Sequence, residues 1–419
     1  MLEKMHDAPS RHCNHDENNY PLPPTTALFY CHKIKIRRDI KNQTRLFVTG
    51  YIIARACPCN FQFEPGGLTL KFIHVLRHYI QQLAAARHLA EEEIHQAVEL
   101  LADENIPVQL KADFLGALAE KGETPEEIAA FARALRRKAI LPPLAEELRA
   151  REILDVVGTG GDRLGTFNIS TAAAIICSAA GVAVAKHGNR AVTSQAGSAD
   201  VLEALGVRID LTPAEAARSL LEHNFAFFFA PNYHPAFKHI SSARKLCAER
   251  GRRTIFNLLG PLLNPAQPSV MLMGVARPEL CEPLGRVLQS LGVRRAMVVC
   301  GKVPGVGFLD ELSPLGENTI AEFYQERGFA VSTAFPEQFP LQRAMLADLL
   351  GGNQIANAQI IRDIFSGNER GAKRDAVLLN AAAALFVAGK TKSLAEGWML
   401  AAEIIDGGRA NAKLKELAD

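Results

Sequence analysis

The fold class follows from the run Ile153-Leu154-Asp155-Val156-Val157-Gly158-Thr159-Gly160-Gly161-Asp162. Its first five residues are mostly apolar and predict a buried strand over 153–157. Three glycines within four positions follow at once, and they predict a turn whose backbone N–H groups are open to an anion, most often a phosphate. A tight connection without a ligand is the alternative. The turn is neither a dinucleotide-binding nor a Walker loop, because position 163 is arginine and Gly165 precedes Thr166.

Strands and helices alternate on the C-terminal side of this turn. This alternation predicts a mostly parallel central sheet covered by helices on both faces. From Gly352 onward the pattern is helical again, and these later helices could pack either on the sheet or on an earlier helical module. The predicted strands are 153–157, 182–185, 225–229, 270–275 and 296–300, and the predicted helices include 170–180, one capped by Thr212, 279–291 and 375–388.

The N-terminal side has two different parts. Residues 1–66 are polar, lack a sustained period and predict a poorly ordered extension. From residue 68 the apolar spacing becomes helical, and Thr124 with Glu127 forms a capping box at the start of one helix. We therefore expect an α/β protein with a small all-helical N-terminal domain (67–140), to which later helices could contribute, and a larger α/β domain (141–419).

Composition limits the class of protein. The 419 residues include 47 Lys and Arg against 45 Asp and Glu, a net charge of +2, with 48% hydrophobic and 22% charged residues. This balance is typical of a folded globular chain. It offers no concentrated basic excess for nucleic acid, and no apolar run reaches the ~18 residues of a membrane helix. We therefore expect neither nucleic acid nor a membrane as a partner.

The eight cysteines form no disulfide framework, since four lie in the first 59 residues and the others are scattered singly. A reducing, cytoplasmic location is therefore expected. The early Cys and His residues match no paired-ligand spacing, so a reduced tail is favoured over a zinc site. A wrongly assigned start codon would also explain this segment.

Polar residues follow the glycine turn and the next strand. Residues 168–171 place three polar side chains at one helix N-terminus, more than capping requires. Residues 186–190 add a lysine, a histidine and an arginine after the next strand, and Ser194 and Ser198 follow. Because parallel strands bring these segments to one edge of the sheet, they predict a cleft for a ligand with more than one phosphate.

Two further features suit such a ligand. Asp310 and Glu311 are adjacent carboxylates that follow the strand at 296–300. Beside a polyphosphate they would be natural magnesium ligands, because this hard cation takes carboxylate oxygens and bridges phosphates. Arg244 could hold a substrate carboxylate in a bidentate pair.

Together these segments resemble the anthranilate phosphoribosyltransferase family, over about residues 68–419. The resemblance implies Mg²⁺-dependent transfer of phosphoribose from phosphoribosyl pyrophosphate (PRPP) to the amino group of anthranilate, the second step of tryptophan synthesis from chorismate. It also implies a homodimer joined through the N-terminal helices. The matching runs are 155–162, 166–171, 186–190, 197–206, 253–262 and 309–311.

The resemblance further implies roles for single residues. The residues implied for PRPP are Gly158, Gly161, Asp162, Thr166, Asn168, Ile169, Ser170, Thr171, Lys186, His187, Gly188, Asn189, Arg190, Ala191, Val192, Thr193, Ser194 and Ser198. Those implied for anthranilate are Gly158, Asn189 and Arg244, with His187, Gly260 and Pro261 bordering the same pocket. Those implied for magnesium are Ser170, Asp310 and Glu311.

Some positions depart from the family pattern, and two other classes stay open. Gln195 and Ala196 lie where relatives often carry Lys or Ser, and the 302–306 loop looks longer than usual. A pyrimidine nucleoside phosphorylase would share the architecture but would need neither the acid pair nor Arg244. A nucleic-acid-binding paralogue would carry degraded motifs and a basic face, so the intact motifs and balanced charge favour the transferase.

Overall fold

The computed structural model describes residues 34–38, 44–48, 65–191, 195–325 and 328–419, and the chain divides into two compact units, 1–63 and 64–419. The first unit contains an antiparallel pair of strands, β1 (Ile34–Arg38) and β2 (Thr44–Val48), which the sequence did not predict. The predicted extension, residues 1–66, also overlaps the start of a helix at Pro65, and its other residues, with the four cysteines, lie outside the described residues.

The unit 64–419 is built on an eight-stranded sheet with the order β10-β9-β7-β6-β3-β4-β5, in which β8 pairs with β7 outside this path. Five adjacent strands, β5-β4-β3-β6-β7, run parallel, and β8, β9 and β10 are antiparallel. The strands are β3 (Ile153–Gly158), β4 (Ala183–Gly188), β5 (Phe225–Phe229), β6 (Val270–Gly274), β7 (Arg295–Val303), β8 (Gly307–Leu309), β9 (Asn318–Tyr324) and β10 (Gly328–Ala334).

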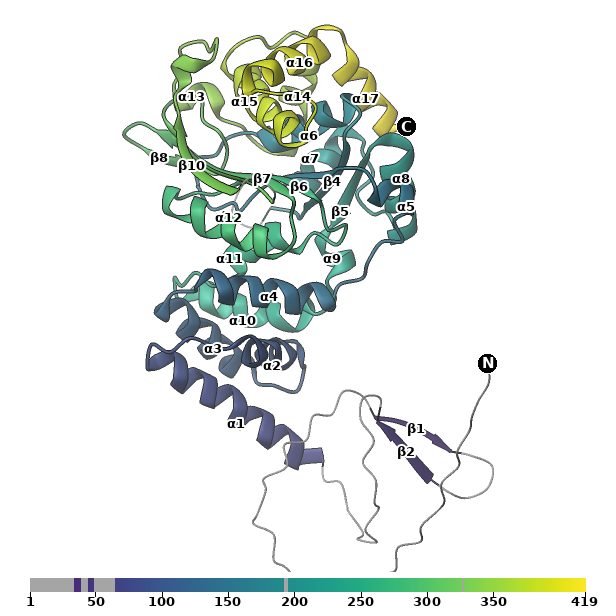
Figure 1. Cartoon of the computed structure of the whole chain (residues 1–419), viewed down its shortest axis with the longest axis vertical. Helices are drawn as coiled ribbons and strands as arrows, with labels where there is room; N and C mark the ends of the chain where they lie inside the picture. The colour runs from purple at the N-terminus through teal and green to yellow at the C-terminus, as the bar shows by residue number, and fades with distance from the viewer. Residues whose placement is uncertain (1–33, 39–43, 49–64, 192–194, 326–327) are drawn as a thin grey trace, which may run out of the picture. The chain divides into compact units, whose positions relative to one another are not determined.

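Helices cover both faces of the sheet (Figure 1). On one face α6 (Ile169–Ala179) packs against α15 (Ala372–Val387), and α15 in turn packs on α16 (Leu394–Asp406). On the other face α12 (Cys281–Ser290) packs on β7 and β9. The alanine-rich helix α15 therefore belongs to the sheet, since its small side chains let it approach α6 closely. The predicted α/β class with a mostly parallel sheet is confirmed.

The first four helices of this unit form a bundle: α1 (Pro65–Ala84), α2 (Glu91–Ala102), α3 (Val108–Lys121) and α4 (Pro125–Arg137). The predicted capping box begins α4, where the Glu127 N–H donates to Thr124 Oγ1 at 3.2 Å. A later helix, α10 (Phe237–Glu249), packs against α2 and α3 and contributes Ile240, Ala243 and Cys247 to their apolar core.

Further helices and turns connect these elements.

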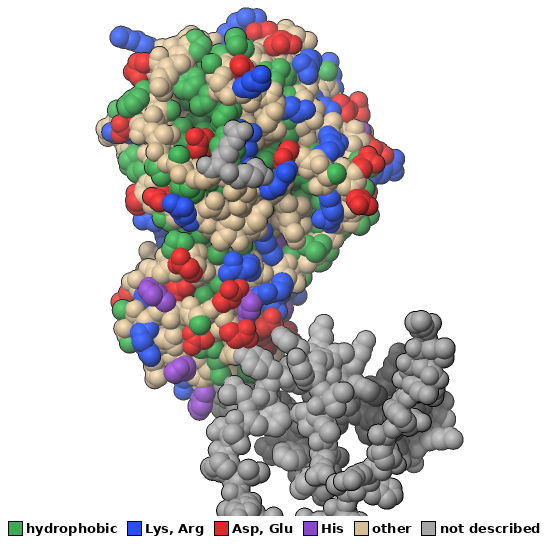
Figure 2. Space-filling model, in the orientation of Figure 1, with side chains coloured by type: hydrophobic (Ala, Val, Ile, Leu, Met, Phe, Trp, Pro, Cys, Tyr) green, Lys and Arg blue, Asp and Glu red, His purple; other side chains and the backbone are tan. Residues whose placement is uncertain are grey.

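None of the described helices is long and apolar enough to cross a membrane. On the face shown in Figure 2, acidic and basic side chains are interspersed, as the balanced net charge leads one to expect. The remaining helices are α5 (Glu146–Arg149), α7 (Ser198–Leu205), α8 (Pro213–His223), α9 (Ala230–Tyr233), α11 (Phe256–Leu259), η1 (Gly260–Leu263), η2 (Pro278–Leu280), η3 (Pro336–Gln338), α13 (Leu346–Leu349), α14 (Gln354–Phe365) and α17 (Arg409–Ala418).

Candidate active site

The predicted glycine turn and the predicted acid pair meet at the carboxyl ends of the parallel strands. β7 extends beyond its neighbours and reverses into β8, which returns the chain across the ends of β6 and β3. Asp310 directly follows β8, and its Oδ2 accepts a hydrogen bond of 2.6 Å from the N–H of Gly160. Two segments 150 residues apart in sequence therefore form one site.

Three glycines make this approach possible. Gly158 of β3 and Gly274 of β6 are neighbours in the sheet, and a Cβ at either position would overlap with Asp310. A Cβ on Gly301 of β7 would lie 2.5 Å from the carbonyl oxygen of Glu311. The ends of β3, β6 and β7 thus form a floor without side chains, on which residues 310–313, hereafter the acid loop, lie in close contact.

The N-terminus of α6 faces the same loop. The N–H of Ser170 has no partner within the helix, because it lies in the first turn, and it donates to Glu311 Oε1 at 2.9 Å. Asn168 occupies the N-cap position, but its side chain does not cap the helix. Its Oδ1 instead accepts from Asn357 Nδ2 at 2.9 Å, and its Nδ2 donates to the Ala196 carbonyl at 3.3 Å. Capping by Asn168 therefore does not explain this polar cluster.

Lys186 lies within β4, and its side chain reaches the same cluster. Its Nζ donates to the Val156 carbonyl at 2.6 Å and lies 3.5 Å from Ser170 Oγ. The strand predicted from the sequence ended at residue 185. In the structure, parallel pairing with β5 continues through Gly188, and Lys186 is buried. Burial lowers the pKa of Lys186, against the attraction of Asp155 and Glu311.

Asp155 is a buried counter-charge beneath Lys186. Its Oδ2 accepts from Asn264 Nδ2 at 2.8 Å, and its Oδ1 accepts from the His187 N–H at 3.4 Å. Burial raises the pKa of Asp155 to about 6, although Lys186 opposes this shift. Asp155 stands within the recognised motif, but no pattern in the sequence predicted a role for it or for Asn264.

The acids at the site repel one another. Burial and the nearby charge of Asp162 raise the pKa of Asp310 to about 7. Burial and the charge of Asp310 raise the pKa of Glu311 well above its usual value, and Lys186 offsets only part of this effect. A cation placed here would relieve the repulsion, because an opposite charge favours the ionised carboxylate.

His187 borders a second, mostly apolar region. Its Nδ1 lies 3.2 Å from the Gly260 carbonyl, an acceptor, so Nδ1 carries the proton of a neutral ring. Burial and then the adjacent His234 lower the pKa of His187 to about 3. The two imidazoles meet edge to face with ring centroids 5.3 Å apart. Their Nε2 atoms are buried without a hydrogen-bond partner among the described residues.

A run of rings connects this region with Arg244. His234 lies 5.6 Å from Phe237, and Phe237 lies 5.5 Å from Phe256, measured between ring centroids. The guanidinium of Arg244 is 5.2 Å from the centre of the Phe256 ring. Burial lowers the pKa of Arg244, and no carboxylate pairs with it in the described part of the chain. Arg244 is thus a half-buried cation beside an apolar wall.

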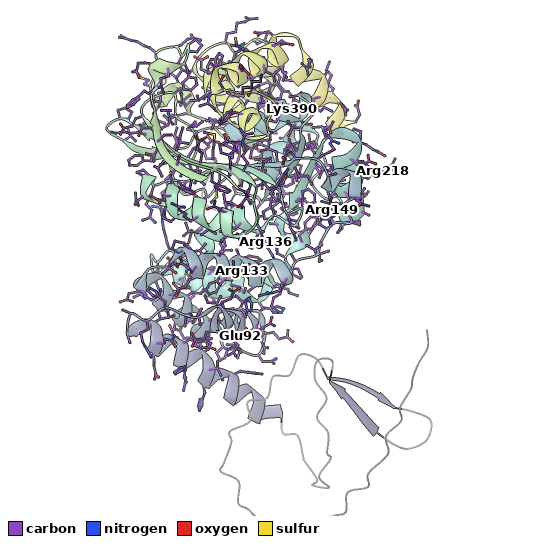
Figure 3. All side chains as sticks on the ribbon, viewed as in Figure 1. Glu92, Arg133, Arg136, Arg149, Arg218 and Lys390 are labelled. Carbon is purple, nitrogen blue, oxygen red and sulfur yellow. The ribbon has the colours of Figure 1, made fainter. Side chains whose placement is uncertain are left out.

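Arg136, labelled in Figure 3, joins the helical bundle to this region, because its Nε donates to the Leu262 carbonyl at 2.6 Å. Leu262 lies in η1, the turn that also holds Gly260 and Pro261. Burial lowers the pKa of Arg136 to about 10. One wall of the apolar region is therefore fixed to the end of α4.

The remaining predicted residues have diverse surroundings. Arg190 is paired with Asp200 and Glu203 of α7 at 2.9 and 2.8 Å, so its guanidinium faces this helix. Gly188 lies directly against Ser198. Thr166 forms an antiparallel bridge with Leu350. Val192, Thr193 and Ser194 lie outside the described residues. Six other predicted residues lie within them: Gly161, Asp162, Ile169, Thr171, Asn189 and Ala191.

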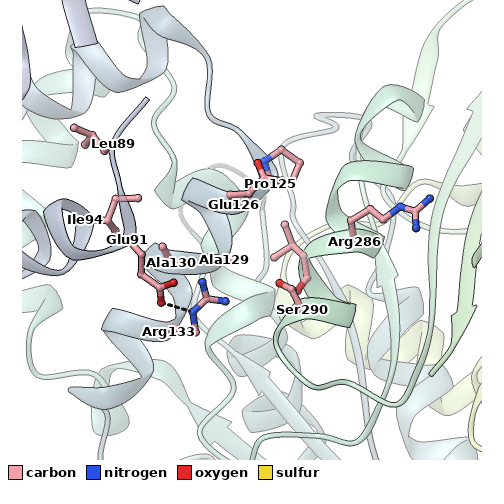
Figure 4. A pocket seen from close by; sticks show the side chains of 11 residues that line it. Leu89, Glu91, Ile94, Pro125, Glu126, Ala129, Ala130, Arg133, Arg286 and Ser290 are labelled. Carbon is pink, nitrogen blue, oxygen red and sulfur yellow. Dashed lines mark hydrogen bonds and ion pairs between the residues drawn. The ribbon is translucent and has the colours of Figure 1, made fainter. Parts of the chain in front are cut away.

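Two cavities lie apart from these groups. One of about 250 Å³ lies between α2, α4 and α12, where Glu91 pairs with Arg133 on one wall and Arg286 and Ser290 line the other (Figure 4). Another of about 880 Å³ lies between residues 302–317 and 335–348. No predicted site residue lines either of them. We place the site at the strand ends because the charged groups, the glycine turn and the N-terminus of α6 converge there.

Comparison with known proteins identifies the class. Residues 150–411 match the family model described as "Glycosyl transferase family, a/b domain", and residues 77–139 match "Glycosyl transferase family, helical bundle domain". The chain therefore belongs to the glycosyl transferase family that combines these two domains. Within that family, the curated relatives described next define the group more narrowly. The chain belongs to the anthranilate phosphoribosyltransferases, as its sequence motifs predicted.

The relatives cover most of the chain. The anthranilate phosphoribosyltransferase of Petrotoga mobilis is 46% identical over 345 residues, 82% of this chain and 96% of that protein. The crystal structure of the Thermus thermophilus enzyme has a TM-score of 0.73 and 42% identity, and covers 81% of this chain and 98% of that one. The Saccharomyces cerevisiae enzyme in complex with PRPP and Mg has a TM-score of 0.73 and 28% identity, covering 83% and 97%.

Proposed function

We propose that this protein transfers the phosphoribosyl group of PRPP to the amino group of anthranilate and releases pyrophosphate. The observation that carries this proposal is the convergence of the glycine turn, the N-terminus of α6 and the acid loop at one edge of the sheet. A helix start and a glycine turn are places where backbone N–H groups bind anions, and here the N–H groups of Gly160 and Ser170 already bind the carboxylates of Asp310 and Glu311. Lys186 adds a buried cation directly behind them.

The acid loop supports a role for Mg²⁺. No three His, Cys, Asp or Glu side chains in the described ranges are arranged to hold a metal by themselves. Mg²⁺ is usually held by one or two carboxylates together with waters and substrate phosphates, which fits Asp310 and Glu311 opposite a phosphate cradle. Burial and the neighbouring carboxylates raise the pKa of both acids, and a bound cation would favour their ionised forms. Ser170, whose N–H contacts Glu311, would complete this set.

The chemistry asked of these residues is electrostatic. Loss of pyrophosphate leaves positive charge on the sugar ring and negative charge on the leaving group. Bound Mg²⁺ would neutralise part of that negative charge. The turn amides and Lys186 hold the phosphates in place before the bond breaks, so that little reorganisation is needed during the reaction. No covalent nucleophile is required of this chain.

Anthranilate would bind between the acid loop and the rings of His234, Phe237 and Phe256. The half-buried guanidinium of Arg244 would receive its carboxylate in a bidentate pair, and Phe237 and Phe256 would contact its ring. Gly158 and Asn189 would line the side near the sugar. The neutral His187 with Gly260 and Pro261 would form the wall, since an uncharged imidazole does not compete for the carboxylate.

A direct assay tests the proposal. Purified protein is mixed with PRPP, Mg²⁺ and anthranilate, and the loss of anthranilate fluorescence is followed. We expect loss that depends on all three, and much slower loss for the Glu311→Gln variant. Phosphorolysis of a pyrimidine nucleoside by inorganic phosphate, without turnover of anthranilate, would contradict the proposal and support the alternative class.

We further propose that catalysis needs only the unit 64–419 and that this unit forms a homodimer through its helical bundle. The two family matches both lie within this unit, and Phe72 on α1 and Val108 on α3 are exposed apolar side chains of the bundle. A chain lacking residues 1–63 should retain its rate. Sedimentation at equilibrium should give twice the mass of one chain, and a monomer would contradict the dimer.

A further inference from the structure

The acid loop is held on its far side by one amide from a distant helix. Asn380 of α15 accepts a hydrogen bond of 3.0 Å from the N–H of Leu312 and donates one of 3.0 Å to the carbonyl of the same residue. Its Nδ2 also donates to the Ala376 carbonyl of its own helix at 2.9 Å. Leu312 directly follows Glu311, so this amide fixes the peptide units on both sides of Leu312.

Two properties make this contact specific. Asn380 and Leu312 are each only 2% exposed, so water does not replace the hydrogen bonds if they are lost. A carboxamide carries a donor and an acceptor on one planar group, and it can therefore satisfy an N–H and a carbonyl of one residue together. Neither an ionised aspartate nor an apolar side chain of similar size can do both.

The opposite side of the loop rests on the glycine floor. Gly274 lies directly beneath the Asp310 backbone, with no space between them for a side chain. Ser313, which follows Leu312, donates its N–H to Asn318 Oδ1 at 2.7 Å. The backbone that carries the two acids is therefore held from below by glycines, and beyond Glu311 by two buried asparagines.

We propose that Asn380 is a positioning residue for the metal: it fixes the Asp310 and Glu311 carboxylates in the orientation that binds Mg²⁺ opposite PRPP. This inference rests on the proposed function. Asn380 would touch neither substrate nor metal and would act through Leu312. Because α15 also packs on α6, the same helix supports the carboxylates and the phosphate-facing amides.

Metal binding is the direct test. Mn²⁺ is titrated into the full chain with PRPP, and free Mn²⁺ is measured by its electron spin resonance signal. For Asn380→Asp, which keeps the acceptor but loses the donor, and for Asn380→Ser, we expect the Kd for Mn²⁺ to rise at least tenfold. The Mg²⁺ concentration for half-maximal rate should rise in parallel, while the KM for anthranilate stays within twofold.

Asp375→Ala is the matched control. Asp375 lies on the same helix and is 3% exposed. It accepts a hydrogen bond of 2.9 Å from the N–H of Gln342, which is not part of the acid loop. We expect this variant to lower the melting temperature without changing the Kd for Mn²⁺. Unchanged Mn²⁺ affinity in both Asn380 variants, or equal loss in Asp375→Ala, would overturn the inference. If the unaltered chain with PRPP binds no Mn²⁺, the proposed function fails and this inference fails with it.

Discussion

Replacing His234 by phenylalanine should remove one contribution that destabilises the folded protein in mild acid. His187 and His234 are each 5% exposed, and burial lowers their pKa values to about 3 and about 4. In the unfolded chain a histidine has a pKa of about 6.5. The unfolded state therefore binds more protons below this pH, and the folded state loses stability as the pH falls through 6.5.

The magnitude follows from the size of these shifts. At pH 5.5 the unfolded chain gains about 1.4 kcal/mol from protonating each of these histidines, while both remain neutral in the folded protein. The raised pKa values of Asp310 and Glu311 act in the opposite direction, since these groups take up protons in the folded state first. The total pH dependence is thus a sum of opposing effects, and only a comparison between variants isolates His234.

The assay is urea unfolding at pH 7.5 and 5.5, followed by the fluorescence of Trp398, the single tryptophan. A phenylalanine ring fits the position because His234 already stacks edge to face with Phe237. We expect the change in unfolding free energy between the two pH values to differ by about 1.4 kcal/mol between the unaltered protein and His234→Phe. His74→Gln removes an exposed histidine and serves as the control. A difference below about 0.5 kcal/mol, or an equal one in the control, would refute the reasoning.

Three further predictions concern the site. Arg244→Ala should raise the KM for anthranilate roughly 30- to 150-fold, because about 2–3 kcal/mol of charge-assisted hydrogen bonding is lost, and the KM for PRPP should not change; steady-state kinetics with both substrates would contradict this if both KM values rose alike. Asp310→Asn combined with Glu311→Gln should lower the rate roughly a thousandfold at any Mg²⁺ concentration, and full activity across a Mg²⁺ series would exclude the proposed metal site. Gly274→Ala should displace the acid loop and lower kcat roughly a hundredfold, with an unchanged far-ultraviolet circular dichroism spectrum; an unchanged kcat would show that the loop does not need the glycine floor.

The local features of this protein could be predicted from its sequence. The strand Phe225–Phe229, the capping box of Thr124 with Glu127 and the glycine turn after β3 each depend on residues within a few positions of one another. Such short-range patterns are determined by backbone sterics, hydrogen bonding and apolar periodicity. The long family motifs then identified the class, because several of them occur in the right order.

Other features arise from competition between local and distant partners. Asn168 is a good N-cap residue by type, yet its amide binds Asn357, 189 residues further along the chain. The strand β4 extends through Gly188 because pairing with β5 and the hydrogen bond from His187 to the buried Asp155 stabilise it there. The sequence shows the residue types at these positions but not which partner prevails.

The sequence by itself determined the alternation of strands and helices, the glycine turn after β3 and the position of the acid pair in the chain. Only the tertiary structure decided that Gly274 lies beneath Asp310 and that Asn380 holds Leu312, 68 residues away. The reason is that these contacts depend on the packing of distant segments, such as β3 beside β6, which are neighbours in the sheet but not in the chain. A buried asparagine in an alanine-rich helix has no pattern of its own, and its role is defined by the backbone that packing brings against it.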